Sequence, residues 1–264
     1  MAQSETEEIL TYQVEDGVGW IRLNRPRQRN AIDARLRAAL LAAVKQGARD
    51  ETARVLVVTG EGPAFCAGAD INEFTDFEGL GGLPDEYGTL LTTLRAMPKP
   101  TIASIRGAAA GIGVGLALCC DLRLATPDAF FRVAFVDIGL TVDGGATWLL
   151  PRVIGSARTL ELCYTGRRLA AEEAERWGLV NRVVPTDQLD TAVAELAGKL
   201  ARGPRAALGA MKRSVAYGEQ AGFEETVTFE FLLQSTLVGT PDFKEGVTAF
   251  LEKRAPNFGG GAGI

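Results

Sequence analysis

The most informative absence from this sequence is histidine, because none of its 264 residues is one. A chain without imidazole cannot build a Ser-His-Asp triad, a Cys-His pair or a metal site that uses histidine ligands. Histidine is also the usual acid–base group of enzymes. Any proton transfer here must therefore use a carboxylate, a lysine, a tyrosine or a cysteine.

Cysteine and long apolar runs are scarce as well. There are four cysteines, Cys119 and Cys120 are adjacent, and no C-x-x-C occurs, so neither a metal site nor a redox pair is predicted. The first ten residues are acidic and polar, unlike a signal peptide. The longest apolar stretch, near 107–120, is too short to span a membrane. We expect free thiols, no membrane contact and a cytoplasmic location.

Strong positive charge is also missing, since 28 Lys and Arg face 33 Asp and Glu for a net charge of −5. This mild acidity argues against nucleic acid as a partner. The hydrophobic fraction of 47% is ordinary for a globular protein. A chain of this length can bury a stable core without disulfides, as one large domain or two small ones.

The first half of the chain alternates strand and helix signals. Two runs separated by a glycine turn, LTYQVED and GWIRLNR, predict a β-hairpin. Asp33 follows at the place where a side chain would cap a helix, and a second helix is predicted over 85–97. Buried parallel strands are predicted from four further runs, RVLVVTG, TIASIRG, DLRLAT and, less regularly, FFRVAF. This alternation predicts stacked β/α units.

The second half is mostly helical, with VNRVVP as its one clear strand candidate. Amphipathic helices are predicted over four segments, 187–202, 204–217, 222–238 and 241–253. The final FGGGAGI is rich in glycine, and we expect it to be disordered. We therefore divide the chain into an α/β core, 1–199, and a C-terminal helical region, 200–264.

Two loops of small residues are suited to presenting backbone N–H groups. The first covers 65–70 and the second 107–113, and each follows a predicted strand. Small residues let a ligand approach the backbone, and the start of a helix leaves N–H groups unpaired. Two such loops on neighbouring strands could direct two donors at one oxygen, which is an oxyanion hole. Close packing of strand on helix is the alternative, and neither loop matches a P-loop or dinucleotide fingerprint.

A series of motifs, in one order along nearly the whole chain, resembles the crotonase superfamily, also called the enoyl-CoA hydratase/isomerase family. The motifs are Asn24-Arg25-Pro26 with Asn30-Ala31, AFCAGAD, KPTIASIRGAAAGIGVGLALCCDLRLA, GLTVDGGATWLLPRVIG, AAEEAERWGLVNRVVP and FKEGVTAFLEKRAPNF. The resemblance implies an α/β fold, a spiral of stacked ββα units with a C-terminal helical region that trimerises. It implies acyl-CoA thioesters as substrates, no cofactor beyond their CoA moiety, and a homotrimer or a hexamer formed from two trimers.

The resemblance also assigns roles by position. Two backbone N–H groups stabilise an enolate on the thioester oxygen in this family, and they fall on Ala69 and Ile112. Hydratases of the family carry two glutamates that handle water and the α-proton, and these positions are Gly115 and Phe135 here. The loss of both acids argues against a hydratase.

A different acid is present, Asp143 within the segment 139–145. This segment is similar to that of family isomerases acting on ring-epoxide or 3-enoyl thioesters in phenylacetate-type degradation, whose single aspartate takes this position. It also resembles aroyl-CoA dehalogenases, whose nucleophilic aspartate lies there. An Asp-Gly pair can equally be a plain turn. We favour an isomerase with Asp143 as proton shuttle; the alternatives are a hydratase, a dehalogenase or thioester hydrolase with Asp143 as nucleophile, and a weakly catalytic CoA-binding protein.

Residues that would bind CoA are assigned by the same resemblance. Arg29 is our choice for a phosphate contact from the cluster RPRQR, and the Ala67 carbonyl matches the acceptor of the adenine amino group, next to Gly68. Near the end of the chain, Phe250 and Lys253 match residues that reach the nucleotide, in some relatives from a neighbouring subunit.

Three further expectations concern the segment after the first loop. Asp70 is placed with the CoA-binding residues, although a helix cap or a lock on the loop is its simpler role. Glu73 is expected to be exposed to solvent. Residues 71–97 are expected to form a flap over the acyl pocket.

Overall fold

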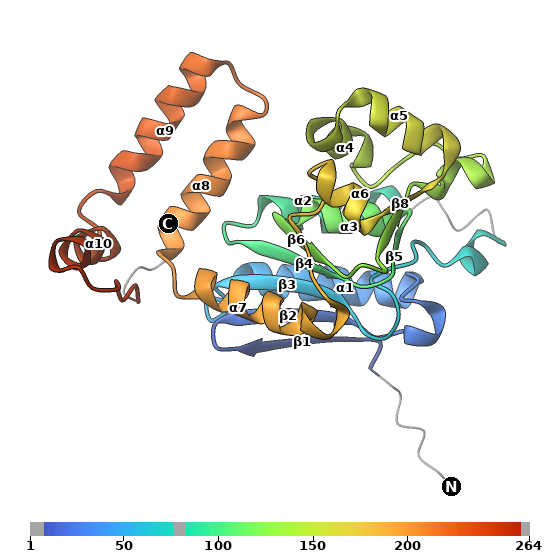
Figure 1. Ribbon diagram of the computed structural model, residues 1–264, viewed down its shortest axis with the longest axis horizontal. Helices are drawn as coiled ribbons and strands as arrows, with labels where there is room; N and C mark the ends of the chain where they lie inside the picture. The colour runs from blue at the N-terminus through green and yellow to red at the C-terminus, as the bar shows by residue number, and fades with distance from the viewer. Residues whose placement is uncertain (1–7, 76–82, 260–264) are drawn as a thin grey trace, which may run out of the picture.

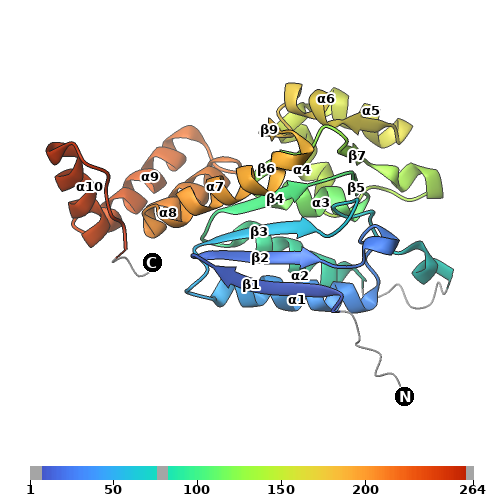
Figure 2. The same cartoon turned by 60° about the horizontal axis from the view of Figure 1, so that its bottom comes forward.

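The computed structural model describes residues 8–75 and 83–259 (Figure 1). They form an α/β core from which three C-terminal helices extend to one side, a separation that Figure 2 shows from a second direction. The predicted α/β class is confirmed.

The main sheet has six strands in the order β1-β2-β3-β4-β6-β9. The strands are β1 (Leu10–Glu15), β2 (Val18–Leu23), β3 (Val55–Gly60), β4 (Thr101–Ile105), β6 (Leu122–Ala125) and β9 (Arg182–Val183). Strands β1 and β2 pair as the predicted hairpin, turning at Asp16 and Gly17, both with positive φ as a two-residue hairpin turn requires. All the other pairs are parallel, and β3 and β4 are buried throughout, as their continuous apolar sequences predict.

A smaller sheet beside it has the order β5-β7-β8, built from β5 (Ala108–Ala110), β7 (Phe130–Arg132) and β8 (Arg168–Ala170). The strand predicted from FFRVAF is confirmed only for its first half. The second half enters the 3-10 helix η4 (Ala134–Ile138), which ends at Gly139 with a φ of 73°. Strand β8 was not predicted, since three residues carry no periodicity and its partner β7 lies far away in the sequence.

Helices cover both faces of the main sheet. On one face lie α1 (Ala34–Arg49), α2 (Leu83–Ala96) and α3 (Ile112–Cys119), whose apolar residues form the larger core. On the other face, α7 (Leu189–Ala201) packs through Leu189, Val193 and Ala197. The predicted cap of α1 is confirmed, because the Leu36 N–H donates to Asp33 Oδ1 at 2.8 Å.

The remaining helices cover the smaller sheet and form the C-terminal region. They are α4 (Ala146–Ile154), α5 (Ser156–Thr165), α6 (Ala171–Arg176), α8 (Arg205–Gly218), α9 (Phe223–Leu237) and α10 (Pro241–Glu252), with 3-10 helices η1 (Pro26–Gln28), η2 (Ile71–Thr75) and η5 (Thr186–Gln188). The four C-terminal helices predicted from the sequence are confirmed to within about two residues at each end. No helix in the described part is both long and apolar enough to cross a membrane. The last residues of the glycine-rich tail, 260–264, lie outside the described residues.

Candidate active site

The two loops of small residues run side by side at the ends of neighbouring strands. Cys66 and Ala109 form an isolated parallel bridge, in which the Ala110 N–H donates to the Cys66 carbonyl at 2.9 Å. Ala69 and Ile112 each follow the bridged residue of their own loop by three positions (69 − 66 = 3 and 112 − 109 = 3). The backbone register thus brings these two residues to equivalent places on paired loops.

The first loop is held from its other side by the chain before α1. The Ile32 N–H donates to the Gly68 carbonyl at 2.8 Å, and the Asp70 N–H donates to the Ile32 carbonyl at 2.9 Å. Because backbone groups alternate in direction along an extended chain, the Ala69 N–H points away from Ile32. Within the described residues this N–H has no acceptor of its own.

The second donor lies at the start of α3. The Gly111 N–H donates to the Arg132 carbonyl at 2.9 Å, whereas the N–H of Ile112, the first residue of the helix, has no acceptor in the described part of the chain. Such N–H groups favour negative charge at the helix N-terminus. Gly68 has a φ of 103°, and a Cβ there would approach the Ala110 carbonyl oxygen to 3.0 Å, which explains glycine at this position. The arrangement suits two N–H donors to one oxygen.

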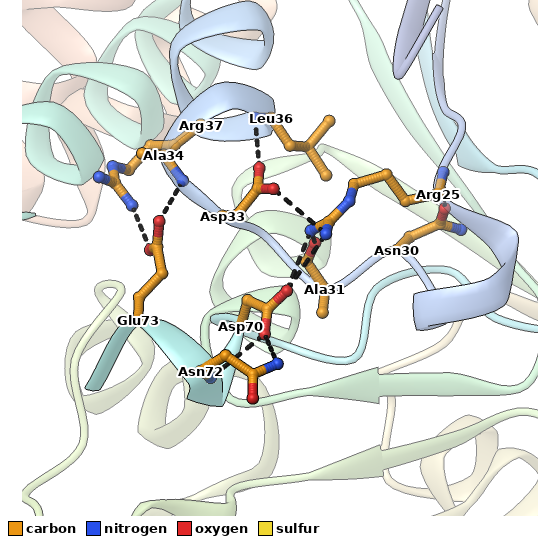
Figure 3. Close-up of polar contacts among 10 residues, drawn as sticks. All are labelled: Arg25, Asn30, Ala31, Asp33, Ala34, Leu36, Arg37, Asp70, Asn72 and Glu73. Atoms are coloured by element: carbon orange, nitrogen blue, oxygen red, sulfur yellow. Dashed lines mark hydrogen bonds and ion pairs between the residues drawn. The ribbon is translucent and has the colours of Figure 1, made fainter. Parts of the chain in front are cut away.

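A partly buried ion-pair network fixes the first loop (Figure 3). Arg25 Nη2 lies 3.1 Å from Asp33 Oδ2 and 3.2 Å from Asp70 Oδ2, and Arg25 Nη1 donates to the Ala31 carbonyl at 2.5 Å. Burial would raise the pKa of Asp70, but hydrogen bonds from Asn72 and the ion pair with Arg25 lower it overall. Asp70 is therefore a lock on the loop, its carboxylate bound to protein groups rather than offered to CoA, and Arg25 is not available for a phosphate.

Asn30 supports the same loop, and the sequence analysis gave it no role. It is fully buried with a φ of 57°; its Oδ1 accepts from the Arg25 N–H at 2.8 Å, and its Nδ2 donates to the Ala64 carbonyl at 2.7 Å and the Glu61 carbonyl at 3.0 Å. The only signal was the Asn30-Ala31 pair in the family motif.

Arg29 and Ala67, both expected to bind CoA, are neighbours in space. The Arg29 carbonyl accepts from the Ala67 N–H at 3.0 Å, so the chain around Arg29 is joined to the donor loop. The Arg29 side chain is exposed and forms no ion pair within the residues described. The Ala67 carbonyl likewise accepts no hydrogen bond there. A cation and a carbonyl oxygen are thus available beside Ala69.

The expectation that Glu73 is solvent-exposed is wrong. Its carboxylate accepts from the Ala34 N–H and lies 3.1 Å from Arg37 Nη1, as Figure 3 shows. Arg37 is itself buried and also pairs with Glu86 at the start of α2. The start of an amphipathic helix leaves backbone N–H groups that attract such a carboxylate, and spacing along the chain could not reveal this. Residues 76–82 of the expected flap lie outside the described residues.

Asp143 lies between η4 and α4, and no side-chain hydrogen bond or ion pair engages it within the described residues. Its backbone carbonyl accepts from the Ala146 N–H at 3.2 Å. The residue is exposed, yet the protein around its carboxylate replaces enough water to raise its pKa. An unpaired carboxylate with raised basicity can accept and return a proton.

The loop of Asp143 packs against the second donor. A Cβ built on Gly144 would lie 2.7 Å from Ile112 Cδ1, so Asp143 is one residue away from direct contact with the Ile112 side chain. The two positions at which the family resemblance expects glutamates each contact one of these loops. A Cβ on Gly115 would lie 2.4 Å from the Gly144 carbonyl oxygen, and the ring of Phe135 reaches within 4.0 Å of a Cβ built on Gly111. Backbone and a phenyl ring occupy the two places, and neither can hold a water as a carboxylate does.

The cysteine nearest this site is chemically inert. Burial raises the pKa of the Cys66 thiol to about 12, although a hydrogen bond from the Gly68 N–H acts in the opposite direction. All four cysteines are free thiols, and no cluster of metal-ligating side chains occurs among the residues that the structure describes. Asp143, whose loop contacts Ile112 through Gly144, remains the acid–base candidate.

Phe250 and Lys253 are not brought to this site within one chain. Phe250, near the end of α10, is 83% exposed, and Lys253 follows the helix with a φ of 54°. Figures 1 and 2 both place α10 at the opposite end of the molecule from β5 and the start of α3.

Comparisons with known proteins point in one direction. The model of a family described as enoyl-CoA hydratase/isomerase matches residues 13–261. A protein of Rhodobacter capsulatus named probable enoyl-CoA hydratase is 41% identical over 95% of this chain and 98% of its own. The 1,2-epoxyphenylacetyl-CoA isomerase of Escherichia coli is 38% identical over 96% and 99%. The crystal structure of an enoyl-CoA hydratase from Bacillus anthracis superposes with a TM-score of 0.92 at 33% identity. The superposition covers 96% of this chain and 100% of that chain.

Proposed function

The chain belongs to the enoyl-CoA hydratase/isomerase family, and we propose that it is an acyl-CoA isomerase that moves a double bond with Asp143 as the proton shuttle. One observation carries this choice over a hydratase. The Asp143 carboxylate has no side-chain hydrogen bond or ion pair within the described residues, and its loop packs through Gly144 against the Ile112 side chain, while the family resemblance puts Gly115 and Phe135 where hydratases have their two acids. A single carboxylate suffices to move a proton, whereas water addition also needs a positioned water.

The proposed reaction is a proton transfer between two carbons of one substrate. The thioester oxygen accepts hydrogen bonds from the N–H groups of Ala69 and Ile112, which stabilise the negative charge that develops there. Asp143 takes the α-proton of a 3-enoyl thioester, and the electron pair of that C–H bond moves onto the thioester oxygen as an enolate. The enolate collapses with a new double bond between the α- and β-carbons, and Asp143 returns the proton to the γ-carbon. No water and no cofactor are consumed.

The CoA moiety would lie along the first donor loop. In this proposal the Arg29 guanidinium meets a phosphate, and the Ala67 carbonyl, beside Gly68 and without a hydrogen bond in the described residues, receives the adenine amino group. Phe250 and Lys253 would reach the nucleotide only from a neighbouring copy, since α10 lies away from the site of its own chain. Replacing Arg29 by Met should therefore raise KM for acyl-CoA with kcat unchanged, and an unchanged KM would contradict this role.

We further propose that residues 200–264 join copies of the chain into a homotrimer or hexamer. Large apolar side chains on α9 and α10 are exposed, among them Phe223, Phe231, Leu232, Phe243, Phe250 and Leu251. Monomeric proteins rarely expose large contiguous apolar patches, and exposed apolar residues of this size are concentrated on these two helices. A groove of about 570 Å³ lies among the same helices. Light scattering coupled to size-exclusion chromatography should give three or six times the chain mass, and a monomer would contradict the proposal.

The reaction is tested by giving purified protein 3-enoyl-CoA and 2-enoyl-CoA separately and following both migration and hydration. We expect migration, and we expect Asp143→Asn to reduce it by about 10²- to 10⁴-fold, the range for loss of a general base. Asp128→Asn, which alters an exposed aspartate that belongs to neither loop, is the matched control. Rapid hydration without migration would overturn the proposal, and so would an Asp143→Asn variant with unchanged turnover.

A nucleophilic role for Asp143 is separated from proton shuttling by trapping. Because its carboxylate has no hydrogen bond or ion pair within the described residues, attack on an aroyl-CoA or thioester carbon would be open to it. Rapid quench and mass spectrometry should find no acyl group on Asp143 during isomerisation. A covalent adduct that forms and decays at the rate of turnover would replace the shuttle with a nucleophile.

A further inference from the structure

We infer that Gly115 is a positioning residue. Because it has no side chain, the Asp143 loop can pack directly against the backbone of α3 at this position, close to the side chain of Ile112. The inference rests on the proposed function, because it assigns what holds the proposed proton shuttle in place. It concerns a contact between two glycine backbones rather than a side chain.

The contact leaves no room for any side chain at position 115. A Cβ built there would lie 2.4 Å from the carbonyl oxygen of Gly144 and 3.1 Å from both its carbonyl carbon and its Cα. These are backbone atoms, which cannot rotate away as the end of a flexible side chain can. Even the methyl group of alanine would therefore have to move the loop, and Asp143 is the residue next to the atoms that would move.

Gly144 is constrained on a second side by Ile112. Its φ of 66° is in the left-handed region that favours glycine, and a Cβ on it would lie 2.7 Å from Ile112 Cδ1. The loop is thus in close contact with Gly115 and Ile112 at once. Since no side-chain hydrogen bond or ion pair engages Asp143 within the described residues, the packing of Gly144 is what places the Asp143 backbone relative to the start of α3.

Gly113, two residues before Gly115 in α3, contacts the first donor loop instead of the Asp143 loop. A Cβ on Gly113 would lie 2.6 Å from the carbonyl oxygen of Cys66, in the first donor loop, not in the Asp143 loop. One glycine therefore touches the oxyanion loop and the other, two residues later, touches the acid loop. This difference allows the two positions to be tested against each other.

Moving the Asp143 loop outward should affect the chemical step more than binding. A displacement of about 1 Å in a catalytic group can cost about 10²-fold in rate. The outward movement would also return water to the Asp143 carboxylate, and burial is the sole cause of its raised pKa, without a contribution from any charged side chain. The acid limb of the pH–kcat/KM profile, which reports the free enzyme, should then shift to lower pH.

The test compares Gly115→Ala, Gly113→Ala and Gly198→Ala, each purified as the full chain and assayed with a 3-enoyl-CoA. Gly198, in α7, is the control because a Cβ there meets only the end of the flexible Arg202 side chain, at 3.2 Å. We expect Gly115→Ala to lower kcat by 10- to 100-fold with KM within threefold and the acid limb at lower pH. We expect Gly113→Ala to lower kcat without shifting the limb, and Gly198→Ala to change neither.

The inference is overturned if Gly115→Ala keeps the wild-type kcat, or if its kcat falls with an unshifted acid limb. Should Gly115→Ala not fold, Gly144→Ala displaces the same loop from its other contact, Ile112 Cδ1, with the same expected loss and shift. Loss of activity in Asp143→Asn with normal activity in Gly115→Ala would refute this inference alone. Full activity in Asp143→Asn would instead refute the proposed function on which it rests.

Discussion

The two halves of the candidate site are held in place by different means. The loop that carries Ala69 is fixed by hydrogen bonds and ion pairs, through Ile32 on one side, the bridge at Cys66 on the other, and Arg25 bound to Asp70. The loop that carries Asp143 is fixed by the shape of the backbone around Gly144. Polar groups satisfy one another in the first half, while the second leaves its carboxylate unpaired.

This difference suits the task that we propose for each half. Donors to an oxyanion must be rigid and aimed in advance, which a dense hydrogen-bond network provides. A proton shuttle must keep its lone pairs for the substrate, and a partner bound to its carboxylate would lower the pKa and compete for the proton. Packing without hydrogen bonds holds such a group while leaving it basic.

Among these tests, removing the proposed N–H donor of Ile112, which lies where α3 meets both loops, should have the largest effect. Ile112→Pro deletes the N–H at the first position of α3, where proline fits a helix. We expect kcat to fall by about 10²- to 10³-fold, which corresponds to about 3 kcal/mol. Ile112→Val keeps the N–H and is the control, with an expected loss in stability of about 1 kcal/mol. Equal kcat values for the two variants, measured at saturating acyl-CoA, would contradict the role of this donor.

Breaking the ion-pair network should mainly cost stability. Arg25→Met leaves the carboxylates of Asp33 and Asp70 partly buried without their cation, and we expect the free energy of unfolding to fall by about 2 kcal/mol, less than for a fully buried pair. The exposed Arg27 provides the control Arg27→Met, which should stay within about 0.5 kcal/mol. Urea denaturation measures both, and equal midpoints would show that the network does not hold the loop.

Lowering the pH should affect the two halves at different pH values, because the pKa of Asp143 is raised and the pKa of Asp70 is lowered. The raised pKa of Asp143 means that its base form is lost first as pH falls, and kcat/KM should then drop about tenfold per pH unit. The lowered pKa of Asp70 contributes stability that is present above its ordinary pKa and is lost only as pH falls through the lower folded value. Activity should therefore disappear at a pH where the protein is still folded. Coincident loss of kcat/KM and of ellipticity would contradict this order.

The smallest expected effect is at the cap of α1. Asp33→Ala removes the acceptor of the Leu36 N–H and one partner of Arg25, and we expect a loss of about 1 kcal/mol in the free energy of unfolding. Asp33→Asn keeps the cap but not the charge, so the difference between the variants measures the ion pair. An alanine variant as stable as wild type would show that α1 needs neither.

The sequence predicted what depends on neighbours along the chain. The hairpin, the cap at Asp33 and the four C-terminal helices each leave a local pattern, and the structure bears them out. The two donor loops could be placed for the same reason, because each comes directly after a buried strand. Family motifs then supplied the positions of Ala69, Ile112 and Asp143, which composition and spacing alone could not.

What could not be predicted depends on residues distant in the sequence. Arg25 was grouped with Arg27 and Arg29 as a basic cluster, yet its partner Asp70 lies 45 positions away. Glu73 carries no local sign that it meets the start of α1. The glycine at 115 could be noticed as a missing acid, but its close approach to Gly144 appears only when the chain is folded.

The parallel bridge between Cys66 and Ala109 has a consequence for how this chain can vary. Both proposed donors are backbone groups counted from that bridge, so their alignment depends on the number of residues in each loop as well as on glycine at the close contacts of positions 68 and 113. A single inserted or deleted residue between positions 66 and 69 would put the two donors out of step, whereas many substitutions by small residues would not. For this site, the length of each loop is therefore the feature on which the alignment of the two proposed donors depends most.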